Sequence, residues 1–402
     1  MHVIVLGAGV VGTTTAYYLS QMGCRVTVVD RASDVGDGAS FANAGQLSYS
    51  FTDALAKPEF LASMPRLLLG KEPGTRVRLT PGLMAWGLRF LGQCTTKRAE
   101  QNTVAVLKTA MRSAELMTEL REHVPIEFSH RRAGKLVLLS NEAELKSATA
   151  SSRLKNAHGS DTRILSRAEV TTIEPALEHI SDEFIAAVYS QNDEVADSLK
   201  FTTGLRKWLE DDGRVTFRLS STAKNIVAKR RRAHAVVVDD DTIEADAVVV
   251  CMGAWSNRLL RTIAINPHIY PMRGYSITLP SGAASPSVSV TVLKHRIVFS
   301  NIDGFIRIAG FADFAGFDTS ADVERTRSLL ELAKRVAPDA ANYGSEDIRA
   351  WGGFRPMTPN GQPLVGATGL RGLFLNTGHG MLGWTLACAT GYEAAQAVIR
   401  TH

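Results

Sequence analysis

The chain has 402 residues and 45% hydrophobic content, which supports a large core and, at about 150 residues per domain, more than one domain. Its 45 basic and 40 acidic residues leave a net charge of +5, a small surplus that does not favour a nucleic-acid partner. The four cysteines lack C-x-x-C spacing, so we expect neither a metal site nor disulfides. No window approaches the ~20 uncharged apolar residues of a membrane span, and the first strand begins close to Met1, so we expect a cytoplasmic protein.

A glycine motif follows the first predicted strand. Residues 3–6 are apolar and mostly β-branched, as in a buried parallel strand, and residues 13–22 predict a helix. Between them Gly7, Gly9 and Gly12 have G-x-G-x-x-G spacing. These glycines suit a tight turn, a close pyrophosphate and close helix–strand packing, respectively. The segment therefore predicts a bound dinucleotide whose phosphates lie at a helix N-terminus.

An acidic residue completes the motif. A second predicted strand, residues 25–29, ends at Asp30, which lies 18 residues beyond Gly12. A carboxylate at this place can accept hydrogen bonds from both hydroxyls of the adenosine ribose. Arg31 could favour a 2′-phosphate, but Asp30 would repel that group, so we discount it.

Helical and β-type patterns alternate along the rest of the chain. Residues 55–95 are irregular at first and then helical, and the basic run 229–232 lies between two β-like runs, as in a hairpin turn. Further helices are expected over 99–123, 142–158, 166–173, 197–209, 322–336 and 382–399. Strands are expected over 126–139, 183–189, 247–251, 268–279, 290–300, 304–310, 347–355 and 373–376, with several short ones in 215–246.

Two later glycine-rich segments favour a flavin over a nicotinamide cofactor. Residues 248–255 run from a strand into Gly253, and residues 376–385 form a strand, a loop and the start of the last helix. A nicotinamide enzyme needs one phosphate site, whereas a second helix N-terminus would stabilise an electron-rich flavin ring. A plain helix cap is the alternative interpretation of the second segment, and a nicotinamide enzyme remains the alternative class.

Several motifs together resemble one family. The opening motif, residues 43–46 (NAGQ), 271–276 (PMRGYS), 354–359 (FRPMTP) and 376–387 (NTGHGMLGWTLA) resemble the FAD-dependent D-amino acid dehydrogenase small subunit, within the D-amino acid oxidase and glycine oxidase superfamily. The resemblance covers nearly the whole chain. We therefore predict an α/β fold, with a Rossmann-like FAD-binding domain (1–50, 97–125, 195–265 and 345–402) interleaved with an antiparallel-sheet α+β substrate domain (51–96, 126–194 and 266–344).

The resemblance implies an FAD site. The residues expected to hold the adenosine diphosphate end are Gly7, Gly9, Val10, Val11, Gly12, Asp30, Arg31, Ala223, Gly253 and Trp255. Those expected along the ribityl chain and the ring are Ser40, Asn43, Ala44, Gly45, Gln46, Leu47, Arg355, Gly378, Gly380, Met381, Leu382, Gly383 and Thr385.

Amine oxidation by a flavin needs mainly binding and orientation of the substrate. An arginine fork suits the substrate carboxylate, and Arg355 is the first candidate, with Arg273 and Arg307 as alternatives. Tyr275 could donate to the same carboxylate. His379 is a candidate proton acceptor, although a histidine between two glycines in a flavin loop more often hydrogen-bonds the backbone or the cofactor. Asp193-Glu194 is similar to a family segment that approaches the flavin region, with a solvated loop as the equal alternative. Tyr49 is a weaker candidate for closing the substrate pocket.

The resemblance implies oxidative deamination of a D-amino acid, or of a D-imino acid such as a hydroxyproline isomer, with electrons passing to a quinone. The alternatives are a peroxide-producing oxidase of the glycine or sarcosine type and a flavin-binding subunit of a multi-chain dehydrogenase. Residues 76–90 mix basic and large apolar side chains, so they form either a buried helix or a peripheral contact with the inner face of the cell membrane.

Met381, Tyr49 and residues 292–296 depart from the family pattern, which leaves the substrate open.

Overall fold

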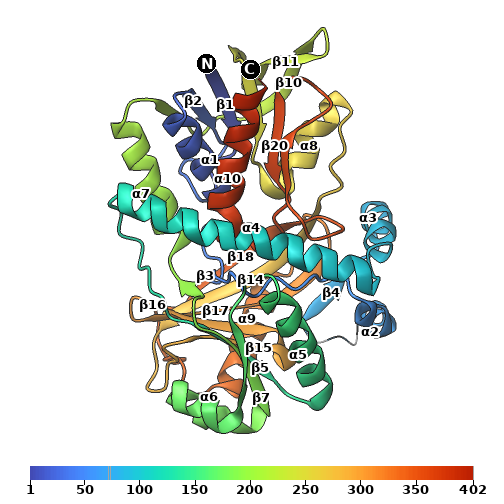
Figure 1. Ribbon diagram of the computed structural model, residues 1–402, viewed down its shortest axis with the longest axis vertical. Coiled ribbons are helices and arrows are strands. Elements are labelled where there is room, and N and C mark those ends of the chain that lie inside the picture. The colour runs from blue at the N-terminus through green and yellow to red at the C-terminus, as the bar shows by residue number, and fades with distance from the viewer. Residues whose placement is uncertain (71, 73, 402) are drawn as a thin grey trace.

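The computed structural model describes residues 1–70, 72 and 74–401 and has two regions, each built on its own sheet (Figure 1). The long helix α4 (Thr96–His123) crosses the molecule between the two regions. Both chain ends lie in the first region, at the side far from the second. The first region thus combines segments from the two ends and the middle of the chain.

The first region contains a six-stranded sheet in the order β19-β20-β13-β1-β2-β9. Its neighbours are parallel except for the edge pair β19–β20. Helices α1, α10, α4 and α7 cover one face and α8 the other, so the central strands are apolar throughout. The bounds are β1 (His2–Leu6), β2 (Arg25–Val29), β9 (Val215–Arg218), β13 (Ala247–Val250), β19 (Leu364–Ala367), β20 (Leu373–Thr377), α1 (Val10–Gln21), α7 (Ser198–Asp211), α8 (Ser256–Leu260) and α10 (Gly383–Arg400).

The first strand lies at a switch in strand order. The chain passes from β1 to β2 on one side and returns much later to β13 on the other. The amide of Gly7 donates to the carbonyl of Val29 at 2.8 Å, and that of Cys251 to the carbonyl of Leu6 at 2.8 Å. The carboxyl ends of three strands therefore meet where open α/β sheets bind their ligands.

The second region contains a mixed sheet in the order β18-β14-β17-β16-β15-β5-β7-β6, with β4 beside β17. Helices α6 and α9 and the 3₁₀ segment η1 pack with one face of this sheet, and α5 packs with the other. The bounds are β4 (Thr75–Val77), β5 (Lys135–Leu139), β6 (Thr162–Ser166), β7 (Ala186–Ser190), β14 (Tyr270–Pro280), β15 (Ser289–Val292), β16 (Ile297–Ile302), β17 (Phe305–Phe314), β18 (Arg349–Met357), α5 (Glu142–Asn156), α6 (Arg167–Ile173), η1 (Pro175–Glu183) and α9 (Asp322–Val336).

Smaller elements complete the fold. Strands β10 (Ala223–Lys229), β11 (Arg232–Val238) and β12 (Asp241–Glu244) form a separate sheet, and the basic run makes the predicted hairpin turn between the first two. Strands β3 (Gln46–Leu47) and β8 (Glu194–Val195) pair with each other. Helices α2 (Pro58–Leu68) and α3 (Pro81–Leu91) lie at one side of the molecule (Figure 1). Short 3₁₀ turns are η2 (Gly253–Trp255), η3 (Arg261–Ile263) and η4 (Leu293–His295).

The predicted α/β class with a second sheet is confirmed, but several element bounds were wrong. Only the last five residues of the expected strand 126–139 are extended in a sheet, after Gly134 at φ 73°. The expected strand 290–300 is two strands, because Arg296 at φ 54° turns the chain between them. Strand β6 was not predicted; it ends at Ser166, which also caps α6 in a capping box with Glu169.

Candidate FAD and substrate site

The glycine turn after β1 is required by packing. Gly7 has φ +105°, and a Cβ on it would lie 2.7 Å from the carbonyl oxygen of Cys251. A Cβ on Gly12 would lie 1.8 Å from the carbonyl oxygen of Gly7. Neither position therefore tolerates a side chain without movement of the backbone, as expected for a turn that brings a phosphate close to the chain.

The start of α1 leaves amides free to bind an anion. Gly9 is the N-cap and offers no side chain, and the first intrahelical bond joins the amide of Thr13 to the carbonyl of Gly9 at 2.9 Å. Ser40 Oγ accepts from the amide of Val10 at 3.0 Å. The amides of Val11 and Gly12 have no intrahelical acceptor, as in any first turn, and so can bind a phosphate.

The end of β2 gathers the residues expected near adenosine. Asp30 accepts from the amides of Ala8 at 2.7 Å and Ala32 at 2.9 Å. Its carboxylate is partly exposed and keeps further lone pairs for ribose hydroxyls. The guanidinium of Arg31 lies 4.0 Å from the ring centroid of Trp255. The loop that leads into Ala223 is held there too, since the amide of Ser221 donates to the carbonyl of Asp30 at 2.9 Å.

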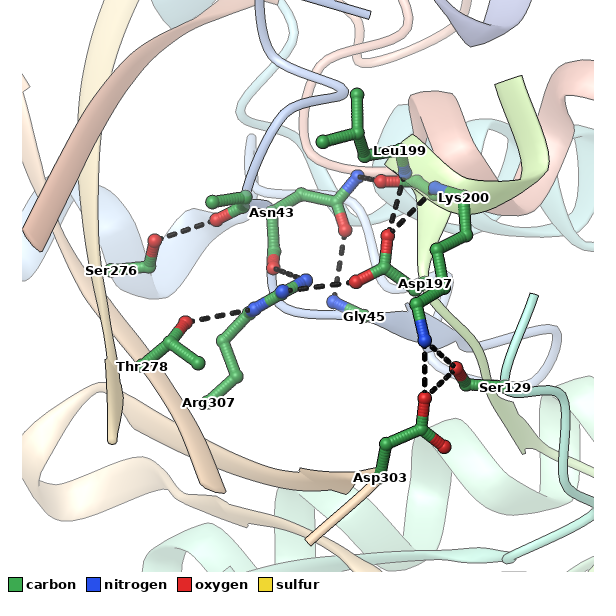
Figure 2. A network of polar contacts seen from close by, with 12 residues as sticks. Asn43, Gly45, Ser129, Asp197, Leu199, Lys200, Ser276, Thr278, Asp303 and Arg307 are labelled. Atoms are coloured by element: carbon green, nitrogen blue, oxygen red, sulfur yellow. Dashed lines mark hydrogen bonds and ion pairs between the residues drawn. The ribbon is translucent and has the colours of Figure 1, made fainter. Parts of the chain in front are cut away.

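The loop before β3 is fixed by a polar network (Figure 2). Asn43 Oδ1 accepts from the amide of Gly45 at 2.9 Å. Arg307 pairs with Asp197 at 3.1 Å and donates to the Asn43 carbonyl at 3.4 Å and to Thr278 Oγ1 at 3.2 Å. Arg307 therefore joins the second sheet to this loop and to α7, which leaves it a poor candidate for the substrate carboxylate.

The segment that follows carries Gln46 and Leu47 across to α10. The side chain of Gln46 donates to Ser300 Oγ at 3.1 Å and accepts from Lys135 Nζ, so it points to the second sheet. The amide of Ser48 donates to Thr385 Oγ1 at 3.0 Å, at the start of α10. The two parts of the chain expected along the flavin are thus in direct contact.

The start of α10 is a second helix N-terminus without a side-chain cap. Gly378 and Gly380 have φ +79° and +57° and shape the loop before it, and Leu382 is the N-cap. Met381 is 54% exposed. The amide of Gly380 donates to the carbonyl of Pro356 at 3.0 Å, which places this loop beside the end of β18.

Strand β18 places Arg355 on the face of the second sheet that meets the loop before β3. The guanidinium lies across Gly274 of β14, where a Cβ would be only 2.2 Å away, and one nitrogen donates to the carbonyl of Phe311 at 2.8 Å. Ser276, on the same face of β14, donates to the carbonyl of Ala42 at 2.6 Å. Burial lowers the pKa of Arg355 to about 10, so it stays charged at neutral pH, with donors left for a carboxylate.

Arg273 and Tyr275 lie on the opposite face, against α9. Arg273 Nε donates to Asp322 at 2.8 Å. Tyr275 donates to Asp313 at 2.9 Å, and the same carboxylate accepts from Arg325 at 2.7 Å. Burial raises the pKa of Tyr275. The expectation that these two residues bind the substrate carboxylate is not supported, because strand alternation turns both away and each has an acidic partner.

His379 is a buried neutral histidine. Its Nε2 lies 2.9 Å from Thr390 Oγ1, whose hydroxyl donates to the carbonyl of Leu386 at 3.0 Å. Burial lowers the pKa of His379 to about 3. A group of so low a basicity is a weak proton acceptor, so of the two roles considered for His379 the structure favours hydrogen bonding.

Two residues that shape this region were assigned no role from the sequence. Gly274 gives Arg355 its place, and Lys135 is a buried lysine that binds Gln46. A lysine that opens an apolar run of β type is a visible signal, whereas the role of Gly274 depends on the register of two strands. Within the described residues no cluster of three metal-binding side chains is present, and no helix is long and apolar enough to cross a membrane.

The glycine turn, the two uncapped helix starts and Asp30 at the end of β2 fit a long dinucleotide, and these features define a flavin-binding oxidoreductase of the α/β class. The family model described as FAD dependent oxidoreductase matches residues 2–397. The chain belongs to this family, and FAD is its cofactor.

Relatives that match over nearly their full length show which members of this broad family the chain is similar to. The chain is 38% identical to a D-amino acid dehydrogenase of Paramagnetospirillum magneticum, with 99% of this chain and 95% of the relative covered. It is 33% identical to a D-amino acid dehydrogenase of Vibrio vulnificus, with 99% and 96% covered. The resemblance drawn from the motifs is therefore confirmed.

Among solved structures, an L-proline dehydrogenase from P. horikoshii has a TM-score of 0.77 at 20% identity, covering 99% of this chain and 93% of that one. A glycine oxidase from Geobacillus kaustophilus has a TM-score of 0.76 at 22% identity, covering 100% and 95%.

Proposed function

We propose that this FAD-dependent enzyme oxidises a D-amino acid, or a cyclic D-imino acid such as a hydroxyproline isomer, and passes the electrons to a quinone. The observation that carries the proposal is the placement of Arg355. Of the three arginines considered for the substrate carboxylate, Arg273 and Arg307 already have carboxylate partners, at 2.8 Å and 3.1 Å, whereas Arg355 binds a backbone carbonyl. Arg355 also lies beside the loop that leads into α10.

The protein's part in the reaction is to bind and orient the substrate. Bound FAD would supply the two-electron acceptor for the hydride that leaves the substrate Cα. A carboxylate on Arg355 would fix one end of the substrate, and the start of α10 supplies positive potential on the cofactor side. The amine must lose its proton before the Cα–H bond breaks. The resulting imine adds water and releases ammonia to give a keto acid, and a cyclic substrate gives a cyclic imine.

The D configuration is supported by the relatives that are named D-amino acid dehydrogenases. The L-proline dehydrogenase and the glycine oxidase, at 20% and 22% identity, show the fold alone and leave the substrate open. An oxidase that produces peroxide is the second candidate, and a flavin subunit that needs partner chains is the third.

The side of the molecule at α2 and α3 supports a peripheral membrane contact. The buried face of α3 consists of Leu83, Trp86 and Phe90, which pack on the second region. On its outer face Met84 and Leu88, one turn apart, are 62% and 73% exposed. Other exposed apolar or basic side chains nearby in the chain are Leu61, Arg66, Leu69, Arg78, Leu79 and Arg89. A basic and apolar surface of this kind suits anionic lipid and a lipid-soluble quinone.

Anaerobic mixing with single amino acids tests the function. The purified holoenzyme is mixed with a panel of D- and L-amino acids, including the hydroxyproline isomers, and the absorbance of oxidised flavin is followed. We expect bleaching by a subset of D substrates; bleaching by none of them, or by L isomers alone, would refute the proposal. Peroxide formation in air as fast as dye reduction would favour the oxidase, and activity that appears only with partner chains would favour the subunit.

A further inference from the structure

A lysine is buried beside the flavin-binding segment. Lys135 opens strand β5, is 1% exposed and donates from Nζ to Gln46 Oε1. Its ammonium lies 4.8 Å from the ring centroid of Phe51. Among the described residues no carboxylate pairs with it within 4.0 Å, although Asp193 is near enough to raise its pKa against the lowering effect of burial. Burial of an ammonium group with so few partners lowers the stability of the fold, so a functional reason for keeping Lys135 is expected.

Asp193 is the matching buried acid. It is 1% exposed, and one carboxylate oxygen accepts from the amide of Ser50 at 3.1 Å. The other oxygen is buried and has no hydrogen-bond partner within the described residues. Burial raises the pKa of Asp193, and Lys135 acts in the opposite direction. The two groups therefore each stabilise the charged form of the other.

Between them these two charges hold residues 46–50, the segment that joins the flavin loop to the second sheet. Lys135 binds its first residue, and Asp193 binds the amide of its last. Every residue of the segment is held in some way: Gln46 also by Ser300, Leu47 by pairing with Glu194, Ser48 by Thr385, Tyr49 by a 3.1 Å bond to Glu194, and the Ser50 carbonyl by Lys155 at 2.9 Å.

We propose that Lys135 and Asp193 are positioning residues that act as one unit to set residues 46–50 against the flavin. Loss of either charge leaves the other buried without compensation, so the segment would shift to let water or a counter-charge reach it. When both charges are removed, no uncompensated charge stays buried and the segment has no reason to shift. The pair thus fixes the environment of the flavin and, through it, the rate of substrate oxidation; the kinetic part of this inference rests on the proposed function.

The pair should respond to pH near neutrality. Other ionisable groups face it from each neighbouring element: Lys155 of α5 with Asp53, and Glu194 of β8 with Tyr49 and His130. Because the pKa of Asp193 is raised and that of Lys135 is lowered, both are charged only within a limited range of pH. Below that range Asp193 takes a proton, and above it Lys135 loses one. The rate of flavin reduction should therefore fall at pH values below and above the range in which both residues are charged.

The test uses the holoenzyme with Lys135→Met, Asp193→Asn and the double variant. Lys294→Met is the control, because Lys294 is half exposed and pairs with Glu183 at 2.9 Å on the rim of the same sheet. The readouts are FAD per chain, the visible spectrum and reduction potential of the flavin, and kcat and KM across pH. We expect each single variant to keep FAD, to shift the spectrum and potential, and to lower kcat about tenfold with little change in KM. Asp193→Asn should also lose the acid limb of the pH profile.

The double variant should lie closer to wild type than either single variant, since the uncompensated charge is gone. Single variants with wild-type spectrum, potential and kcat would overturn the inference. So would activity that falls only in proportion to lost FAD, because that would show a merely structural role. If the wild-type protein oxidises no amino acid, the proposed function fails, and the spectrum and potential of the variants still decide the positioning claim.

Discussion

The guanidinium of Arg355 lies over Gly274, on the neighbouring strand, in the space that a side chain there would fill. A side chain at position 274 would occupy the same space, at 2.2 Å from the guanidinium. The glycine thus lets an arginine from a sheet edge reach the face that meets the flavin loop. The bond from Arg355 to the Phe311 carbonyl at 2.8 Å holds it there with other donors free.

Gly274→Ala should weaken substrate binding while the fold is retained. The added methyl group meets the mobile end of Arg355, which can move aside and would then misplace the substrate carboxylate. We expect KM to rise about tenfold or more with a smaller change in kcat, as measured by steady-state dye reduction. Gly344→Ala is the control, because a Cβ there makes only an ordinary 3.7 Å contact. Equal KM values in the two variants would count against this role of Arg355.

Gly12→Ala should abolish FAD binding. A Cβ at this position would lie 1.8 Å from the backbone oxygen of Gly7, so the turn and the start of α1 would have to move apart. We expect the purified variant to be colourless or to lose its flavin on gel filtration. Gly38→Ala, where nothing lies within 4 Å of the new Cβ, should keep one FAD per chain. Normal flavin content in Gly12→Ala would show that the cradle lies elsewhere.

His379 should make the protein less stable in acid. Its pKa is lowered to about 3, whereas the unfolded chain titrates near 6.5, so the unfolded state gains a proton first as the pH falls. Stability from this group is therefore complete above about pH 6.5 and is lost below it, by at most about 1.4 kcal/mol per pH unit. Thermal unfolding of His379→Asn with excess FAD should show a shallower loss between pH 7 and 5. Parallel curves for variant and wild type would contradict this assignment.

Charge on the outer face of α3 should release the protein from membranes. Met84→Glu with Leu88→Glu places two acids on the exposed apolar surface, and we expect co-sedimentation with anionic vesicles to fall severalfold. Dye reduction should not change, since neither side chain contributes to the buried face of α3. Val323→Glu is a matched control on α9, where Val323 is 72% exposed. Equal sedimentation of the wild type, the Met84→Glu/Leu88→Glu variant and the Val323→Glu control would leave the membrane proposal without support.

Local sequence was sufficient to predict the glycine turn after β1 and the place of Asp30 at the end of β2, and insufficient to predict which face of β14 carries Arg273 and Tyr275. Gly7, Gly12 and Asp30 act within one strand–helix–strand unit, so their spacing specifies their geometry. Arg273 and Tyr275 stand two apart in one strand, which predicts a shared face but not which face. That choice depends on α9, far along the chain, which supplies Asp322. The two later glycine-rich segments favoured a flavin, and the resemblance to a family identified it as FAD. The partners of the three arginines could be seen only in the structure: Arg355 binds a backbone carbonyl, whereas Arg273 and Arg307 pair with carboxylates.

The most direct test compares a D-amino acid with its amide in anaerobic flavin reduction. If Arg355 binds the substrate carboxylate beside the flavin, as we propose, removal of the carboxylate and removal of the arginine should have the same effect. We predict that wild-type enzyme is bleached at least about a hundredfold faster by the acid than by the amide. Arg355→Met should lose most of that preference while it keeps FAD. Equal rates for acid and amide in the wild type, or an unchanged preference in Arg355→Met, would contradict the account.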